Sequence, residues 1–267
     1  MDLSAVERCP VEVLDHIIDY LHDDIPSLAS CSLVCRNWTP STHCHLFRSI
    51  RIAGGGPARL AAFSQFLSST PYVALHVKEL HIRAGDGPAT ITTSTLNPIL
   101  KRLNRLCVLD IRCSYCQFDD DAIPILLSLR KLVMQFVEVD ITPAKFMSTL
   151  ARCPRLKELD IRKSWWAPSL ILPEESNAPV VPFLESLTLG NCRHSSLTNH
   201  LEVLRSRIPM TTLTSLDIVC IAPGDVGVVG GLLRDVGSKL LHLRLRMGSL
   251  LLQGTSTSPI SHFIVIL

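Results

Sequence analysis

The chain has 267 residues, of which 19% are charged, and its formal net charge is +2. This length allows a small module beside a larger body, and so balanced a charge is not the footprint of a nucleic-acid-binding protein. No basic segment followed by an apolar run opens the chain, and no apolar stretch approaches the length of a membrane span, so we predict an intracellular protein, cytoplasmic or nuclear, without membrane contact.

The first predicted element is a helix that begins near Pro10. At about 100° per residue its apolar side chains fill an arc of about 180°, and they are Val11, Val13, Leu14, Ile17, Ile18, Tyr20 and Leu21. A helix that packs against one neighbour needs an apolar stripe only about 100° wide. The excess predicts that this helix also contacts a second partner.

A second helix is predicted to begin at Asp24-Ile25-Pro26, because an N-cap residue is followed there by a proline in the first turn. Leu33 points nearly opposite to the main apolar face, which carries Leu28, Cys31, Val34, Cys35 and Trp38. About forty residues cannot bury enough apolar surface to offset their chain entropy. This helical module is therefore expected to need a partner.

Residues 9–47 resemble the F-box, a motif that docks receptor proteins onto the Skp-type adaptor of a cullin-RING ubiquitin ligase. The resemblance rests on Pro10, Glu12, Val13, Leu14, Ile17, Leu21 and the segment Cys31-Ser-Leu-Val-Cys-Arg-Asn-Trp38. Cys9 and Cys31 replace aliphatic residues of the family pattern, but both are small and apolar. An ordinary helical hairpin at the end of a solenoid would explain the apolar faces, but not Pro-x-Glu and Cys-Arg-x-Trp at these distances.

The resemblance implies an adaptor-binding surface on this module. We predict that Pro10 sets the start of the first helix, and that the adaptor contacts are Leu14, Ile17, Leu21, Leu33, Val34 and Trp38.

Behind the module, a Leu-x-x-Leu-x-Leu template recurs seven times. Its middle positions are 23 to 29 residues apart, at 80, 109, 132, 159, 187, 216 and 243, and Phe47-x-x-Ile50-x-Ile52 is an eighth candidate. Helix-like apolar spacing lies between the copies, for example at Leu60–Leu67, Leu96–Leu103 and Leu201–Ile208, and Thr142-Pro143 is typical of a helix start.

A strand and a helix in each repeat resemble the leucine-rich repeats of F-box proteins of the fungal type. We therefore expect an α/β protein: a three-helix F-box over residues 1–48, followed over residues 49–267 by a solenoid with a parallel concave sheet and outer helices.

Side chains between the template leucines are expected to point onto the concave face. One predicted column is His81, Asp110, Val133, Asp160, Thr188, Asp217 and Arg244, and the next includes Arg83, Arg112, Arg162 and Arg246. Arginine forks match carboxylate and phosphate geometry, so we predict that these four arginines contact an acidic or phosphorylated target. The alternative is a solvated face on which Asp and Arg neutralise each other.

Catalytic and metal-binding patterns are not evident in the sequence. Gly54-Gly55-Gly56 lacks the Lys-Ser/Thr of a phosphate loop, Asp119-Asp120-Asp121 is interpreted as helix-capping acid, and the ten cysteines stand singly as small core residues. Cys113-Ser-Tyr-Cys116 and His43-Cys44-His45 have no matching ligand clusters, so we predict no metal and no cofactor. The longest irregular insert begins at Trp165-Trp166 and ends near Pro182; we interpret it as a cover for the core, and the alternative is that its tryptophans anchor a partner.

The apolar segment Ser261–Leu267 is strand-like and arrives about where another repeat is due, with no polar cap after it. We expect either a truncated gene product, which we favour, or a terminus covered by another surface.

Together these features predict a non-catalytic receptor of an SCF-type ligase that presents an unknown protein substrate for ubiquitin-dependent degradation. The alternative is a repeat scaffold for protein-protein interaction, with a helical cap and no ligase role.

Overall fold

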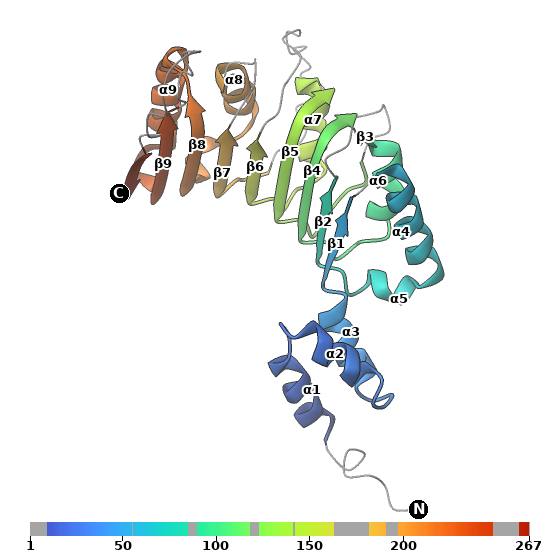
Figure 1. The fold of residues 1–267 in the computed structure, drawn as a ribbon. Coiled ribbons are helices and arrows are strands. Elements are labelled where there is room, and N and C mark those ends of the chain that lie inside the picture. The colour runs from blue at the N-terminus through green and yellow to red at the C-terminus, as the bar shows by residue number, and fades with distance from the viewer. Residues whose placement is uncertain are drawn as a thin grey trace, which may run out of the picture.

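The computed structural model describes residues 10–54, 56–84, 90–117, 123–140, 142–162, 182–190, 197–247 and 262–266. Three helices come first: α1 (Val11–Tyr20), α2 (Ile25–Ser32) and α3 (Thr39–Leu46). They form a separate unit beneath the first strands of a curved sheet (Figure 1). We call residues 10–48 the helical head.

The sheet contains ten strands in the described part of the chain. Their order is β1 (Ser49–Ala53), β2 (Glu79–Arg83), β4 (Val108–Gln117), β5 (Lys131–Asp140), β6 (Glu158–Arg162), β7 (Ser186–Gly190), β8 (Ser215–Ile221), β9 (His242–Met247) and β10 (His262–Ile266), and β3 (Thr90–Thr92) pairs with β4. Strands β1 to β9 are paired in parallel, and β10 is antiparallel to β9.

The strand register follows the sequence template. The middle template residues stand opposite one another in a continuous row that contains Ile50, Leu80, Leu109, Leu132, Leu159, Leu187, Leu216 and Leu243. From Leu80 to Leu216 this row is buried, whereas Ile50 and Leu243 at its two ends are only partly buried. The seven predicted strands and the eighth candidate are therefore confirmed.

The helices of the sheet region lie on one side of the sheet (Figure 1). They are α4 (Pro57–Ser69), α5 (Pro71–Ala74), α6 (Thr93–Leu100), α7 (Pro143–Ala151), α8 (Leu197–Arg207) and α9 (Val226–Val236), with short 3-10 turns η1 (Met210–Thr212), η2 (Pro223–Asp225) and η3 (Gly237–Lys239). Leu60, Ile99, Phe146 and Leu204 of these helices join the template leucines in one core. The Thr142 side chain accepts a hydrogen bond from the Lys145 amide, which confirms the predicted start of α7.

The head has a small core of its own, formed by Leu14, Ile18 and Leu28, which do not belong to the core cluster of the sheet. It is tied to the sheet where α3 meets β1. The Arg48 carbonyl accepts hydrogen bonds from the amides that open β2, and His43 stacks on Tyr72 with ring centroids 5.7 Å apart.

Two features differ from the expectation. Helix α2 ends at Ser32 instead of continuing through Trp38, and a separate helix, α3, begins at Thr39 with Pro40 in its first turn. Strand β10 runs antiparallel, so it is not another copy of the parallel repeat. Asp119–Asp121 and most of the insert after Trp165 lie outside the described residues.

Candidate protein-binding surfaces

The apolar arc of α1 divides into two stripes. Leu14 and Ile18 are buried, and Leu21 beside them is half-buried. Val13, Ile17 and Tyr20, at i, i+4 and i+7, form a second stripe that is exposed, with Tyr20 at 90%.

Contacts with α3 show where the exposed stripe points. Ser41 of α3 donates a hydrogen bond to Asp15, and His45 Nε2 lies 2.8 Å from the Asp19 carboxylate. Both carboxylates lie on the side of α1 opposite to the exposed stripe. Val13, Ile17 and Tyr20 therefore face away from α3, which confirms that α1 carries more apolar surface than its neighbours in the head cover.

The turn between α2 and α3 adds to the exposed apolar surface. Leu33 closes α2 as its C-cap residue and is 87% exposed, and Val34 follows it into the turn. Ile25 at the start of α2 is also exposed. The Asp24 side chain caps this helix by accepting hydrogen bonds from the Ser27 amide and hydroxyl, and these bonds lower the pKa of Asp24.

The predicted adaptor contacts fall into three groups. Pro10, Ile17, Leu33 and Val34 are exposed, and Leu21 and Trp38 are half-buried. Leu14 is 4% exposed, so the prediction that it contacts a partner directly is corrected: it holds α1 onto the rest of the head. The exposed set also includes Val11, Val13, Tyr20 and Ile25, which the motif comparison did not select but most of which the helical arc contains.

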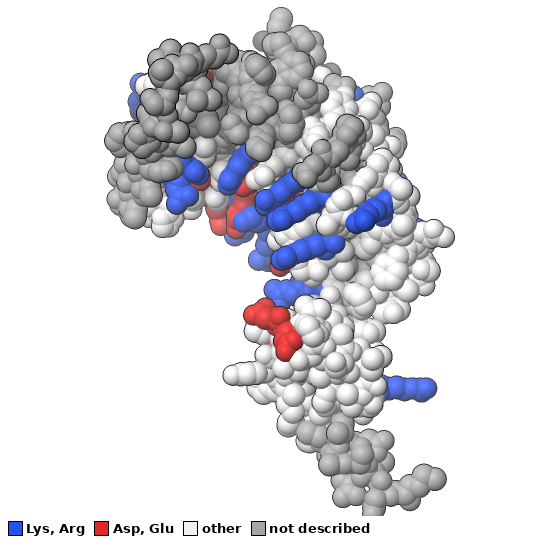
Figure 2. Space-filling model, viewed as in Figure 1, with Lys and Arg blue, Asp and Glu red and all other residues white. Residues whose placement is uncertain are grey.

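The second surface is the concave face, the face of the sheet opposite to the helices. Its middle row is Arg51, His81, Asp110, Val133, Asp160, Thr188, Asp217 and Arg244, and the next row is Ala53, Arg83, Arg112, Gln135, Arg162, Gly190, Val219 and Arg246. These rows confirm the two predicted columns. Figure 2 shows Lys and Arg side chains side by side across this face, with acidic side chains between them.

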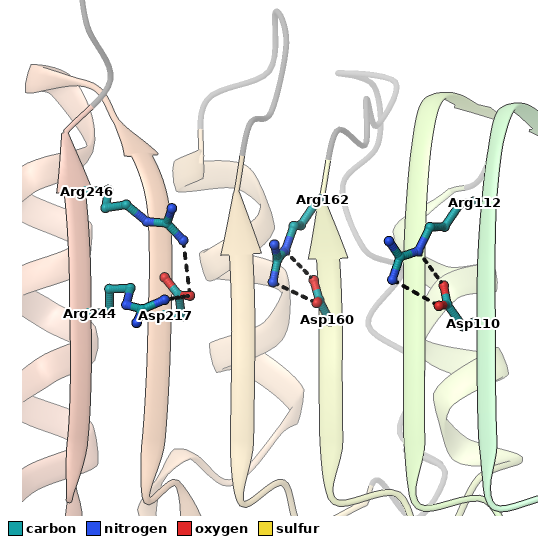
Figure 3. Close-up of polar contacts among 7 residues, drawn as sticks. All are labelled: Asp110, Arg112, Asp160, Arg162, Asp217, Arg244 and Arg246. Carbon is teal, nitrogen blue, oxygen red and sulfur yellow. Dashed lines mark hydrogen bonds and ion pairs between the residues drawn. The ribbon is translucent and has the colours of Figure 1, made fainter. Parts of the chain in front are cut away.

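Two arginines of this face are held by aspartates on their own strands (Figure 3). Arg112 donates from Nε and Nη2 to the two carboxylate oxygens of Asp110 at 2.8 and 3.0 Å. Arg162 makes the same pair of bonds to Asp160 at 2.8 and 2.9 Å. The repeated Asp-Ile-Arg segment explains this geometry, since residues i and i+2 of a strand lie on one face.

Between these two pairs lies Val133, which is 4% exposed although it is on the concave face and outside the main core. Burial alone would raise the pKa of Asp110, but hydrogen bonds from Arg112 and His81 outweigh it and lower that pKa. Burial raises the pKa of Asp160 and prevails over the opposing effects of Arg162, Arg112 and Lys131. The centre of the face is thus largely neutralised.

Asp217 has a different set of partners. Its own strand continues with Val219 where the other two have arginine, and β9 supplies Arg244 opposite it and Arg246 diagonally. Arg246 Nη2 lies 3.4 Å and Arg244 Nη1 3.8 Å from the same oxygen, Oδ2 (Figure 3).

The four predicted target contacts are therefore not equivalent. Arg112, Arg162 and Arg246 are engaged with aspartates, whereas exposed Arg83 forms no ion pair with a described residue. Arg244, half exposed at β9, was not selected from the sequence. The sequence held a signal that distinguishes these arginines. Residues 110–112 and 160–162 read Asp-Ile-Arg, whereas residues 217–219 read Asp-Ile-Val and residues 244–246 read Arg-Leu-Arg.

A cleft of about 770 Å³ lies where the head meets the sheet. Arg48 and Arg51 line it together with Asp23 and Glu79, so its formal charges balance. His22 and His45 complete the side toward the head.

Some of the cysteines lie in the core, as the sequence predicts, and others do not. Cys113, Cys116 and Cys153 are buried, and burial raises the pKa of Cys153 to about 12, whereas Cys44 is exposed at the junction with the sheet. Within the described ranges, no three His, Cys, Asp or Glu side chains gather as metal ligands. No described helix has the length and apolar character needed to cross a membrane.

Comparison with known families bears on the first surface. Residues 7–53 match the F-box-like family model, which spans the helical head and continues into β1. A comparison with curated proteins finds no match for the chain.

Proposed function

We propose that this chain is a non-catalytic substrate receptor of an SCF-type cullin-RING ubiquitin ligase. Residues 1–48 act as the domain that binds the Skp-type adaptor, and residues 49–267 act as a leucine-rich-repeat solenoid that holds a target protein. The supporting observation is that the segment matching the F-box-like family also carries a group of uncovered apolar side chains on α1 and in the turn after α2.

The proposed adaptor surface is built from Val13, Ile17 and Tyr20 on α1 and from Leu33 and Val34 in the turn after α2. Burying a Val, Leu or Ile side chain contributes roughly 1.5–3 kcal/mol, so the four such residues of this surface supply ample driving force for a stable interface, and Tyr20 adds to it. Leu14 and Ile18 keep α1 in place beneath this surface.

The proposed mechanism is proximity. The receptor performs no bond chemistry and increases the effective concentration of a target lysine near the ubiquitin-loading machinery. The target lies on the concave face, where Arg83, Arg112, Arg162 and Arg246 are the proposed contacts. Cytoplasm and nucleus are the compartments that this role requires.

A repeat scaffold is the second candidate, and one observation favours it. The head packs against the sheet through Arg48, His43 and Tyr72, as a solenoid cap would. A cap needs apolar residues toward the sheet, however, and does not need Tyr20 or Leu33 in solvent.

Co-purification separates the two candidates. The full chain is expressed with a Skp-type adaptor, as wild type, as Ile17→Asp/Leu33→Asp and as Leu127→Asp. Leu127 is 62% exposed in the sheet region and serves as the matched control. We expect wild type and Leu127→Asp to retain the adaptor and the double variant to lose it. Failure of wild type to retain it, or full retention by the double variant, favours the scaffold.

A further inference from the structure

The three aspartates of the concave face differ in how completely they neutralise their arginines. Asp110 and Asp160 each hold one guanidinium through two short hydrogen bonds. Asp217 faces two guanidiniums, and the separation of 3.8 Å from Arg244 is too long for a hydrogen bond. Among these three aspartates, Asp217 is therefore the one that faces more guanidinium groups than it can neutralise.

Hydrogen-bonding capacity is also unused in this cluster. Arg246 Nε and Asp217 Oδ1 are buried, and neither has a hydrogen-bond partner among the described residues. The Arg246 guanidinium uses a single nitrogen, at 3.4 Å, whereas Arg112 uses two. A buried donor without an acceptor is costly, so an oxygen ligand that gives this guanidinium a further acceptor gains free energy.

The charge of the cluster selects the type of ligand. Two guanidiniums against one carboxylate leave an excess of one positive charge. A carboxylate ligand neutralises this excess, whereas a phosphate dianion overcompensates it beside the partly buried Asp217. Paired arginine forks also match the two oxygens of a carboxylate.

The neighbouring strand gives access to the cluster. β7 presents Ser186, Thr188 and Gly190 to the same face, and none of them carries a long side chain. An extended segment can therefore lie across β7, next to Asp217 on β8 and one strand further from Arg244, which is half exposed.

We propose that Arg244 and Arg246 form a carboxylate-binding subsite that takes an Asp or Glu side chain of a protein segment lying on the concave face. This proposal rests on the proposed use of that face for target binding, and it is independent of adaptor binding.

Fluorescence anisotropy of the full chain with a labelled hexaglutamate peptide tests the subsite at low ionic strength, with hexaglutamine as the uncharged probe. We expect wild type to bind hexaglutamate and not hexaglutamine. Arg244→Gln is expected to weaken binding about tenfold or more, as loss of a charge-assisted contact does. Circular dichroism and adaptor capture check that the variant is folded and that the head still functions.

Two control variants separate the subsite from general charge. Arg51→Gln removes the same charge from β1, and we expect less than about a threefold change because this exposed position lies far from β8 and β9 in the sheet. Lys131→Gln/Glu158→Gln removes a complete ion pair of the same face without changing net charge and is expected to leave affinity unaltered. Equal weakening by Arg51→Gln and Arg244→Gln, or no binding of hexaglutamate by wild type, would overturn the proposal.

The probe also tests the ligand class. A peptide in which phosphoserine replaces one glutamate is expected to bind no more tightly than hexaglutamate. Markedly tighter binding of the phosphopeptide, lost in Arg244→Gln, contradicts the assignment of a carboxylate.

Discussion

The helical head and the sheet contain the same kinds of apolar side chain and treat them differently. In the sheet, the template residues from Val77 to Ile218 are all nearly inaccessible to solvent. In the head, the only apolar side chains that are nearly inaccessible among the described residues are Leu14, Ile18 and Leu28. Tyr20 and Leu33 are almost fully exposed. Because apolar burial drives both folding and association, the comparison indicates that the sheet buries its template residues by itself, whereas the head keeps a small core and leaves apolar surface available for association.

The largest expected effect is in the sheet core. Leu187→Ala removes a fully buried side chain in the middle of the template row and should lower the free energy of unfolding by about 2–5 kcal/mol. Urea denaturation followed by circular dichroism measures this loss. A change below about 0.5 kcal/mol, the size typical of surface positions, would show that the sheet does not depend on the template row.

The two stripes of α1 should respond differently to truncation. Leu14→Ala is expected to destabilise the head by about 2 kcal/mol, near the lower end for Leu→Ala, because a small core can relax around the cavity. Ile17→Ala, one turn away on the exposed stripe, should cost less than about 0.5 kcal/mol. Hydrogen exchange of the α1 amides reports both values, and similar losses for the two variants would contradict the division into stripes.

A smaller effect is expected where β7 and β8 approach each other. A Cβ atom at Gly190 would lie 2.6 Å from the Val219 Cβ, closer than real contacts allow. Gly190→Ala should therefore cost about 1–3 kcal/mol, as overpacking does. Val219→Ala in the same chain should restore part of the loss, and thermal unfolding of the single and double variants measures the coupling. Equal losses in Gly190→Ala and the double variant argue against this contact as the cause.

The smallest effect concerns pH. The lowered pKa of Asp110 means that its ionised form stabilises the fold at neutral pH, and this contribution is lost as pH falls below about 4, the usual Asp value. The effect of Asp160 on the free energy of unfolding has the opposite sign. Because its pKa is raised, its stabilising contribution is present at low pH and is lost as pH rises.

His81→Ala should raise the pKa of Asp110, since it removes a ring nitrogen 3.2 Å from the carboxylate, and should leave Asp160 unchanged. Carboxyl NMR titration follows both groups. An unaltered Asp110 titration would show that Arg112 alone lowers its pKa.

Much of the sheet was predictable because each repeat places three buried residues at fixed spacing. The register of Leu80, Leu109 and Leu132 follows directly from that spacing. The short strand β3 and the antiparallel β10 were not predictable, because neither carries the template and both are defined by pairing with a distant strand.

The candidate surfaces were only partly predictable. Helical periodicity identified the excess apolar arc of α1, but it could not decide which half faces α3, because that depends on the contacts of Asp15 and Asp19. On the concave face, the columns were predicted correctly, but the different engagement of Arg112 and Arg246 depends on which strand supplies the aspartate.

The affinity of the full chain for a Skp-type adaptor, measured by calorimetric titration for Leu33→Ala and Leu127→Ala, tests the central claim most directly. Both residues are exposed leucines, so both variants should keep wild-type stability. If the uncovered side chains of the head form the docking surface, Leu33→Ala should weaken binding by about tenfold or more and Leu127→Ala should leave it unchanged. Equal affinities for the two variants, or no binding by wild type, would contradict the account.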